Sequence, residues 1–156
     1  MIFNSLFLIL LSVYETSTTM NKPKSVNLPV VVNTWSFLNA TRRAFNVITQ
    51  TNDPMLAVEL GCSECEQLRC DGTVGYGGSP DETGDVALDA MIMDGRTHDV
   101  GSVAGLKSIR NAISVARAVM NYTTHTLLVG ESATKFAIGM GFKLEETHSV
   151  ESMQSW

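Results

Sequence analysis

The chain of 156 residues is 44% hydrophobic and 17% charged, with a net charge of −5 at pH 7. This composition is that of a packed globular domain, and it excludes a disordered or fibrous chain. The 11 lysines and arginines are scattered, with no cluster longer than Arg42-Arg43, so we expect neither nucleic acid nor a membrane surface as a partner.

The N-terminal part of the chain has an apolar run from Leu6 to Val13. A membrane-spanning helix needs about 18 apolar residues or more, whereas the length of this run suits the core of a signal peptide. The usual positive charge ahead of the apolar core is missing, since Lys22 and Lys24 lie after it. We predict a cleaved signal peptide over residues 1–19. A membrane anchor and a mispredicted start are the alternatives.

The first predicted elements are a strand and two helices. A β-branched run predicts a strand over residues 30–35 that is buried on both faces. Residues 39–50 are expected to form a short helix with one apolar face. Asp53 stands before a proline and is expected to cap a second helix over residues 54–66.

A hairpin is the clearest prediction in the middle of the chain. Residues 86–93 alternate between two faces, and Asp94-Gly95 is the two-residue turn typical of tight hairpins. The next apolar side chains recur at steps of three and four residues and predict one stripe of a helix that packs on a sheet. They are Leu106, Ile109, Ile113, Ala116 and Met120.

The last predicted elements are a short strand over residues 125–130 and a helix ended by Gly139 and Gly141. The tail from residue 145 to residue 156 is polar and without a pattern. A hairpin with helices before and after it predicts an α+β layered domain.

Three cysteines, Cys62, Cys65 and Cys70, lie within nine residues. A zinc site would need a second Cys or His pair at matching spacing, and the three histidines are isolated from one another, so no metal is expected. A local disulfide that leaves one thiol over fits a secretory route better.

The segment CDGTVGYGGSP, residues 70–80, carries four glycines. A Walker loop would need Gly-Lys-Ser/Thr at its end, and the dinucleotide fingerprint would need a third glycine where Pro80 stands. Both patterns fail, so we expect no nucleotide and no other cofactor. The glycines instead predict a close approach between two stretches of backbone.

Several motifs stand in the order in which the glycosylasparaginases, also called aspartylglucosaminidases, have them. They are VVNTWSF, NAT, CDGTVGYGGSPDETG, LDAMIMDG and TTHTLLVGESAT, within residues 28–142. The chain therefore resembles this family of N-terminal nucleophile hydrolases. The resemblance implies part of an αββα sandwich, with the α-subunit region over residues 26–144 and the start of an inter-subunit loop over residues 145–156.

The resemblance also implies a precursor that cleaves its own backbone to expose a threonine at a new N-terminus. The threonine hydroxyl attacks the side-chain amide of an asparagine that carries N-acetylglucosamine, and the threonine α-amino group acts as the base. The self-cleaving segment of the family is His-Asp-Thr, which this sequence lacks. We therefore expect no catalytic residue in this chain and no hydrolysis by the chain alone. A β-subunit with the N-terminal threonine is the expected partner, in an αβ heterodimer or a dimer of heterodimers.

Three residues match positions around the substrate of the family. Trp35 matches a tryptophan that lines the substrate pocket, and a core tryptophan is the alternative. Thr34 and Thr73 match positions that support the surroundings of the nucleophile by hydrogen bonding. The family usually has serine at the position of Thr73, and a threonine that merely fills a strand is the alternative there.

The resemblance assigns the covalent features as well. Cys65 and Cys70 match the short-range disulfide of the family, and Cys62 matches its unpaired neighbour. Asn39 begins a glycosylation acceptor that matches one in the α-subunit, and Asn121 begins a second acceptor without a counterpart. Both acceptors fit a route through the secretory pathway to the lysosome.

Two other kinds of protein remain as alternatives. One is a non-catalytic binding or regulatory remnant that pairs with a full-length homologue. The other is an unrelated soluble domain or a cysteine-dependent enzyme. For a glycosylasparaginase-like hydrolase, two substrate ranges remain as alternatives: glycosylated asparagine alone, or both glycosylated and free asparagine.

Overall fold

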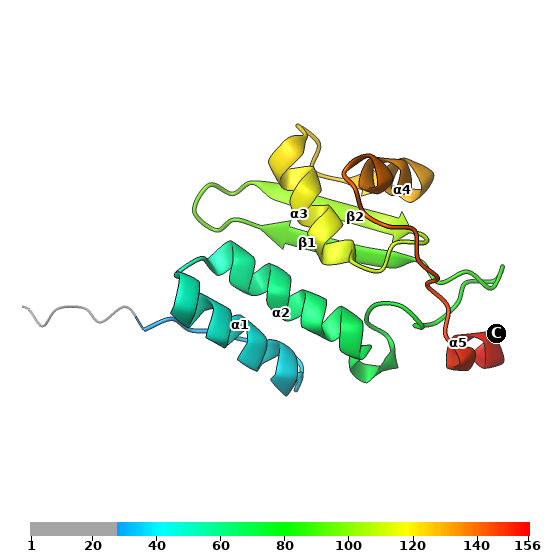
Figure 1. The fold of residues 1–156 in the computed structure, drawn as a ribbon, viewed down its shortest axis with the longest axis horizontal. Coiled ribbons are helices and arrows are strands. Elements are labelled where there is room, and N and C mark those ends of the chain that lie inside the picture. Colours follow the sequence, from blue (N-terminus) through cyan, green and yellow to red (C-terminus); the bar gives the residue numbers. More distant parts are fainter. Residues whose placement is uncertain (1–27) are drawn as a thin grey trace, which may run out of the picture.

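The computed structural model describes residues 28–156 (Figure 1). The predicted signal peptide, residues 1–19, lies outside the described residues. The elements are α1 (Leu38–Thr51), α2 (Pro54–Leu68), the 3-10 turn η1 (Cys70–Gly72), β1 (Leu88–Met93), β2 (Val100–Leu106), α3 (Ala112–Tyr122), β3 (Leu128–Val129), α4 (Gly130–Gly139) and α5 (Val150–Ser155). Within this part of the chain, no helix is both long and apolar enough to span a membrane.

The sheet has three strands in the order β1-β2-β3. β1 and β2 are antiparallel, and β2 and β3 are parallel. Figure 1 shows α3 and α4 over the sheet and the pair α1 and α2 beside it. The predicted α+β class is confirmed by this arrangement of helices and a small mixed sheet.

The main core lies between the sheet and α3. The largest fully buried side chains in the described residues are Ile92, Leu106, Ile109, Val86, Val103, Val115 and Val119. β2 lies so close to α3 at Gly101 that an added Cβ would stand 2.5 Å from the backbone nitrogen of Met120. Glycine is therefore the residue that lets α3 pack on the strand.

The first two helices form where the local sequence signals place them. Asp53 caps α2, because its Oδ1 accepts the backbone N–H of Leu56 at 2.9 Å. Gly61 of α2 packs against α1, where an added Cβ would be 2.9 Å from the Cβ of Ala44. Capping and small-residue packing thus explain this helix pair.

The predicted strand over residues 30–35 is wrong for this structure. The segment has no regular secondary structure, and Val30 and Val32 are 80% and 84% exposed. A strand needs a neighbour to accept and donate its backbone hydrogen bonds. No strand of the described residues pairs with this segment.

The hairpin is confirmed, but its predicted two-residue turn is wrong. The connection runs over residues 94–99, where the N–H of Asp94 donates to the carbonyl of Asp99 at 2.9 Å. The N–H of His98 donates to the carbonyl of Asp94 at 2.7 Å, and His98 takes a left-handed φ of 65°. A histidine rather than Gly95 makes the left-handed step, so the loop is longer than the Asp-Gly signal indicates.

Two further boundaries differ from the predictions. The predicted stripe mixes three elements, since Leu106 belongs to β2 and Ile109 to the connection before α3. Leu106, Ile109, Ile113 and Ala116 are buried in one core that contacts β2 and α3, and Met120 is partly buried against it. The predicted strand over residues 125–130 reduces to Leu128–Val129, while α4 ends at Gly139 as expected.

The tail contains α5, which the sequence pattern did not predict. Ser149 and Ser152 form a reciprocal capping box at its start. The usual sequence signal for a capping box has Glu or Gln three residues after the capping residue, and here Ser152 stands at that position. An ion pair of 3.0 Å between Arg69 and Glu151 holds α5 against the end of α2.

Candidate functional site

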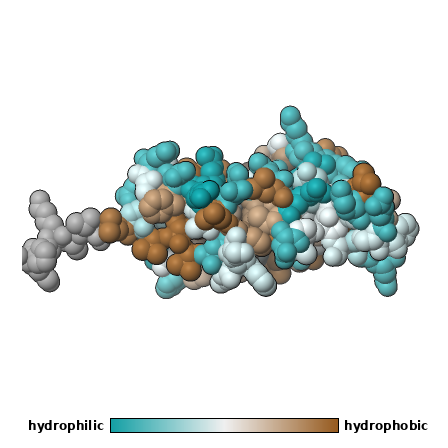
Figure 2. All heavy atoms as spheres, turned by 90° about the horizontal axis from the view of Figure 1, so that it is seen from below, coloured by the Kyte–Doolittle hydropathy of each residue, from teal (hydrophilic) through white to brown (hydrophobic). Residues whose placement is uncertain are grey.

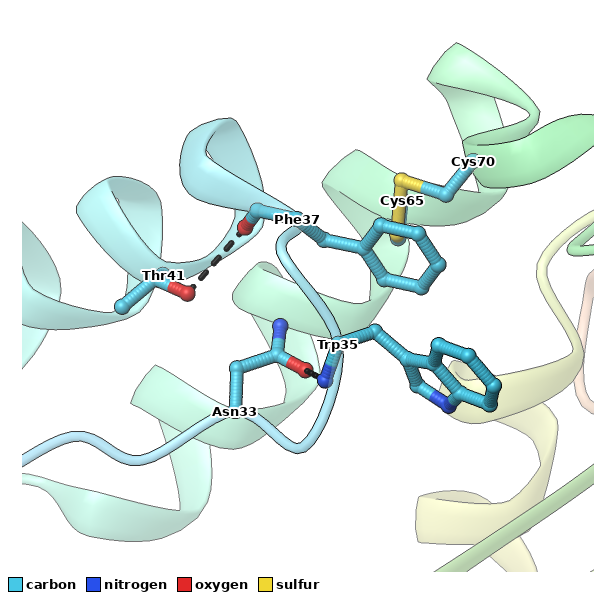
Figure 3. The surroundings of a disulfide bond; sticks show 6 residues. All are labelled: Asn33, Trp35, Phe37, Thr41, Cys65 and Cys70. Carbon is cyan, nitrogen blue, oxygen red and sulfur yellow. Dashed lines mark hydrogen bonds between the residues drawn. A yellow bond between two sulfur atoms is a disulfide. The ribbon is translucent and has the colours of Figure 1, made fainter.

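The turn that leads into α1 carries the predicted pocket tryptophan. The N–H of Trp35 donates to Oδ1 of Asn33 at 3.1 Å, which shapes the turn. The rings of Trp35 and Phe37 stack with their centroids 6.4 Å apart. Figure 3 shows both rings in the surroundings of the disulfide. Trp35 is 68% exposed and therefore does not fill the core of the described domain.

The two predicted supporting threonines lie at the surface. Thr34 is exposed in the bend next to Trp35, and Thr73 is exposed directly after η1. The N–H of Thr73 donates to the carbonyl of Cys70 at 3.3 Å. Neither threonine hydroxyl forms a hydrogen bond within the described residues, so both are open to a group from outside. The role assigned to them remains a prediction.

The disulfide between Cys65 and Cys70 joins the last turn of α2 to η1. It fixes the start of the glycine segment, and Thr73 follows three residues later. Cys62 is free and exposed on α2. The pairing expected from the resemblance is therefore present in the structure.

The glycine segment confirms the predicted close approach of two backbones. Gly75 has a φ of 77°, and an added Cβ would lie 2.7 Å from the Cα of Glu66. At Gly77, with a φ of 73°, an added Cβ would lie 2.7 Å from the Cβ of Ser149. Other residues would be strained in this left-handed conformation and would also displace these neighbours.

Tyr76 lies between these glycines, and its ring makes cation–π contacts with two arginines that the sequence did not indicate. The guanidinium carbon of Arg110 is 3.9 Å from the centroid of the Tyr76 ring, and that of Arg69 is 5.5 Å away. Nε of Arg110 donates to the carbonyl of Glu146 at 2.6 Å. Tyr76 and Arg110 are far apart in sequence, and no local pattern indicates that they meet.

The face of the sheet opposite α3 is apolar and uncovered within the described residues. Met91 and Met93 of β1 point to this face and are 64% and 48% exposed, and Val129 of β3 is 54% exposed. Asp89 lies on the same side of β1 and accepts the N–H of Gly105 at 2.7 Å. Figure 2 views the molecule from below and shows further hydrophobic residues at the surface, most of them towards the left of the view. We call Met91, Met93 and Val129 the outer sheet face.

Both glycosylation acceptors are exposed at helix ends. Asn39 lies in the first turn of α1, and Asn121 lies in the last turn of α3. The described residues contain no group of three or more His, Cys, Asp or Glu side chains placed to hold a metal ion.

Comparison with known proteins then decides the family. Residues 8–156 match the family described as Asparaginase. The chain belongs to this asparaginase family. Its sequence is 60% identical over 119 residues to the N(4)-(Beta-N-acetylglucosaminyl)-L-asparaginase of Rattus norvegicus, which covers 76% of this chain and 34% of the relative. The resemblance to the glycosylasparaginases of the N-terminal nucleophile hydrolase superfamily is thereby confirmed.

Two other relatives show the range of this asparaginase family. The N(4)-(beta-N-acetylglucosaminyl)-L-asparaginase of Mus musculus is 58% identical over 125 residues, which are 80% of this chain and 36% of the relative. The Probable isoaspartyl peptidase/L-asparaginase 3 of Arabidopsis thaliana is 46% identical over 155 residues, which are 97% of this chain and 42% of the relative. The chain thus spans well under half the length of these curated relatives.

Proposed function

We propose that this chain forms the α-subunit part of an amidohydrolase that cleaves N4-(β-N-acetylglucosaminyl)-L-asparagine during glycoprotein breakdown. The observation that carries the proposal is the 60% identity to a rat enzyme named for this activity. The Arabidopsis relative is named for isoaspartyl peptides and L-asparagine, so free asparagine is the competing substrate.

The reaction requires a nucleophile that another polypeptide or a further stretch of sequence supplies. The hydroxyl oxygen of an N-terminal threonine attacks the amide carbon, and its proton passes to the threonine α-amino group. An ester forms as the C–N bond breaks, and the α-ammonium group gives its proton to the leaving nitrogen, so the glycosylamine leaves as a neutral amine. Water then hydrolyses the ester, which releases aspartate and restores the threonine hydroxyl. An α-amino group suits this role near neutral pH because its ordinary pKa is about 7.7 to 8.0.

In this scheme Trp35, Thr34 and Thr73 contribute one wall of the cavity. The exposed indole of Trp35 contacts the substrate, and the two free hydroxyls hydrogen-bond groups around the nucleophile. This assignment is supported by the exposure of all three residues and by the position of Trp35 in the surroundings of the disulfide that anchors the Thr73 segment (Figure 3).

The complementary part also completes the fold as an αββα sandwich. The outer sheet face would pack against a second sheet, because burying exposed Met91, Met93 and Val129 removes apolar area from water. The unpaired segment over residues 30–35 would gain the neighbouring strand that its β-branched sequence calls for. Without that part, we expect the chain to be poorly soluble.

The experiment compares the chain alone with the chain co-expressed with the β-subunit region of the rat relative. Release of aspartate, the product common to both substrates, is measured with glycosylated asparagine and with free asparagine in parallel. The chain alone should show no turnover, since loss of the nucleophile lowers hydrolase rates by about 10⁴-fold to 10⁶-fold. The pair should be active, and turnover by the lone chain would refute the proposal.

A matched pair of variants tests whether Trp35 lines the substrate cavity. Trp35→Ala should lower kcat/KM of the active pair by about tenfold or more, because a pocket side chain contacts the substrate. Tyr122→Ala removes an aromatic side chain of nearly equal exposure, 69% against 68%, from the end of α3. It should leave kcat/KM unchanged. If the two changes altered kcat/KM equally, Trp35 would not be a pocket residue.

We also propose a secretory and lysosomal route with glycans on Asn39 and Asn121. Digestion of the secreted or lysosomal protein with a peptide N-glycosidase should shift its mass by two glycans. Asn39→Gln and Asn121→Gln should each remove one of them. A single glycan lost only in Asn39→Gln would show that the acceptor at Asn121 is unused.

The uncovered outer sheet face also supports a second candidate, a non-catalytic subunit that pairs with a full-length homologue. Co-purification from the native source separates the two. A partner that carries the N-terminal threonine in a catalytically active complex supports the hydrolase, whereas an intact homologue whose activity changes on pairing supports the regulatory subunit.

A further inference from the structure

The glycine segment carries Thr73, which the proposed hydrolase places beside the nucleophile. The disulfide fixes this segment only at its start, at Cys70. Farther along, the ring of Tyr76 lies under the guanidinium of Arg110, with 3.9 Å between the guanidinium carbon and the ring centroid. This is a close cation–π contact. The hydrolase scheme above gives neither of these two residues a role.

Arg110 is a rigid partner for the ring because both ends of the arginine are held. Its backbone follows directly on Ile109, which is buried in the main core. Its Nε donates to the carbonyl of Glu146, in the tail, at 2.6 Å. Arg69, the second arginine at this ring, is 5.5 Å from the centroid and is the weaker contact. Arg110 thus connects Tyr76 both to the core and to the tail.

The tail also contacts the glycine segment directly, one residue after the tyrosine. The N–H of Gly77 donates to the carbonyl of Thr147 at 2.7 Å, and Thr147 is buried. The far end of the glycine segment is therefore held by a cation–π contact and a backbone hydrogen bond, while the disulfide holds its start.

Packing within the loop transmits this second anchor to Thr73. Gly78 is buried, and an added Cβ there would lie 3.2 Å from the carbonyl oxygen of Thr73. Gly75 packs on the backbone of Glu66. The buried carboxyl of Glu66 in turn accepts the N–H of Ile113 through Oε1 at 2.9 Å, which ties α2 to α3. A shift of the anchored end would therefore shift Thr73 as well.

We propose that Tyr76 and Arg110 are positioning residues of the hydrolase, which hold the hydroxyl of Thr73 where it supports the nucleophile. The tyrosine acts through its ring, because its hydroxyl forms no hydrogen bond within residues 28–156. The inference rests on the proposed function, from which it takes the role of Thr73. It adds what keeps Thr73 in place.

Loss of the ring should lower kcat and leave KM nearly unchanged. In the proposed scheme Thr73 supports the nucleophile rather than the bound substrate, so a displaced Thr73 affects the chemical step. A misplacement of about 1 Å can lower a rate by about 100-fold. Tyr76→Leu in the active pair should therefore lower kcat about tenfold to 100-fold and change KM by less than about threefold. Tyr76→Phe keeps the ring and should retain kcat.

A double-mutant cycle separates positioning from a general loss of structure. Thr73→Val alone should lower kcat by about tenfold or more, because a hydrogen bond near the nucleophile is lost. If Tyr76 acts through Thr73, the same change should lower kcat by less than about threefold once Tyr76→Leu is present. A general loss of structure would instead leave the two effects multiplicative.

Amide hydrogen exchange in the same pair shows directly whether the segment is held. The N–H of Gly77 should exchange about tenfold faster or more in Tyr76→Leu and in Arg110→Met, and at the wild-type rate in Tyr76→Phe. Tyr122→Leu is the matched control, because it removes a ring that is 69% exposed at the end of α3. It should change neither kcat nor the exchange of Gly77.

The outcomes distinguish this inference from the proposed function. A pair without turnover would refute the hydrolase and this inference together, and so would an active pair in which Thr73→Val has no effect on kcat refute the role of Thr73. In an active pair, equal effects of Thr73→Val with and without the Tyr76 ring would overturn this inference alone. Unchanged exchange of Gly77, or a Tyr76→Phe variant as slow as Tyr76→Leu, would also overturn it. Circular dichroism checks folding, and Arg110→Met replaces Tyr76→Leu in the cycle if the latter does not fold.

Discussion

The buried carboxyl of Glu66 makes the stability of the fold depend on pH. In the unfolded chain this carboxyl has a pKa near 4.5, and in the folded chain burial raises the pKa to about 7. Between these two values the folded chain holds a proton that the unfolded chain has lost. Unfolding therefore releases a proton, and the free energy of unfolding falls as the pH rises.

The size of this effect follows from the two pKa values. The stabilising contribution is fully present below about pH 4.5 and is lost as the pH rises through about 7. Between pH 5 and pH 8 the free energy of unfolding should fall by about 2 to 3 kcal/mol from this group alone. The fold would then be more stable at the acidic pH of a lysosome than in neutral solution.

Other shifted carboxyls do not oppose this trend in the same interval. A hydrogen bond from the Thr83 hydroxyl is the main cause that lowers the pKa of Asp81 to about 2. The stability that Asp81 contributes is present above its unfolded pKa and is lost only as the pH falls towards 2. Asp81 is ionised in both states between pH 5 and pH 8 and adds no slope there.

The assay is urea unfolding followed by circular dichroism at several pH values between 5 and 8, for the wild-type chain and Glu66→Gln. Glutamine keeps an acceptor for the N–H of Ile113 and cannot ionise, so the variant should lose this part of the pH dependence. The difference between the two chains removes the contribution of every other group. Parallel curves for the two chains would refute the assignment of the slope to Glu66.

Gly101→Ala should lower the free energy of unfolding by about 1 to 3 kcal/mol or more, because the new Cβ would stand 2.5 Å from the Met120 nitrogen. Gly95→Ala, with nothing within 4 Å of the new Cβ, should change it by less than about 0.5 kcal/mol. Urea unfolding measures both, and equal stabilities would contradict the packing argument. Asp53→Ala should cost about 1 kcal/mol, since the Leu56 N–H loses its cap, and an unchanged urea midpoint would show that the cap is dispensable. Reduction of the disulfide between Cys65 and Cys70 should cost about 2 kcal/mol, as expected for a short closed loop, and identical unfolding curves with and without reductant would contradict this.

The helix pair at the start of the domain was predictable because its signals are local. A capping aspartate followed by a proline at the first helical position involves neighbouring residues only, and α2 begins at Pro54 as expected. The alternation of residues 86–93 was equally informative, since it reflects burial of one face of a single strand. The order of motifs likewise identified the family from the sequence.

Strand pairing could not be predicted in the same way. The segment over residues 30–35 has a strong β-branched pattern, but a strand forms only where another backbone completes its hydrogen bonds. In the candidate site, the sequence singled out Trp35, Thr34 and Thr73 by resemblance, while their mutual arrangement depends on the disulfide and on the glycine segment.

Sequence alone thus determined the family, the α+β class and the helices whose signals lie within a few residues of one another. Only the tertiary structure decided that Glu66 is buried with one oxygen that has no partner among residues 28–156, that the guanidinium of Arg110 lies over the ring of Tyr76, and that α3 packs on Gly101. These features join residues far apart along the chain. Their energies depend on burial and distance, which a one-dimensional pattern does not contain.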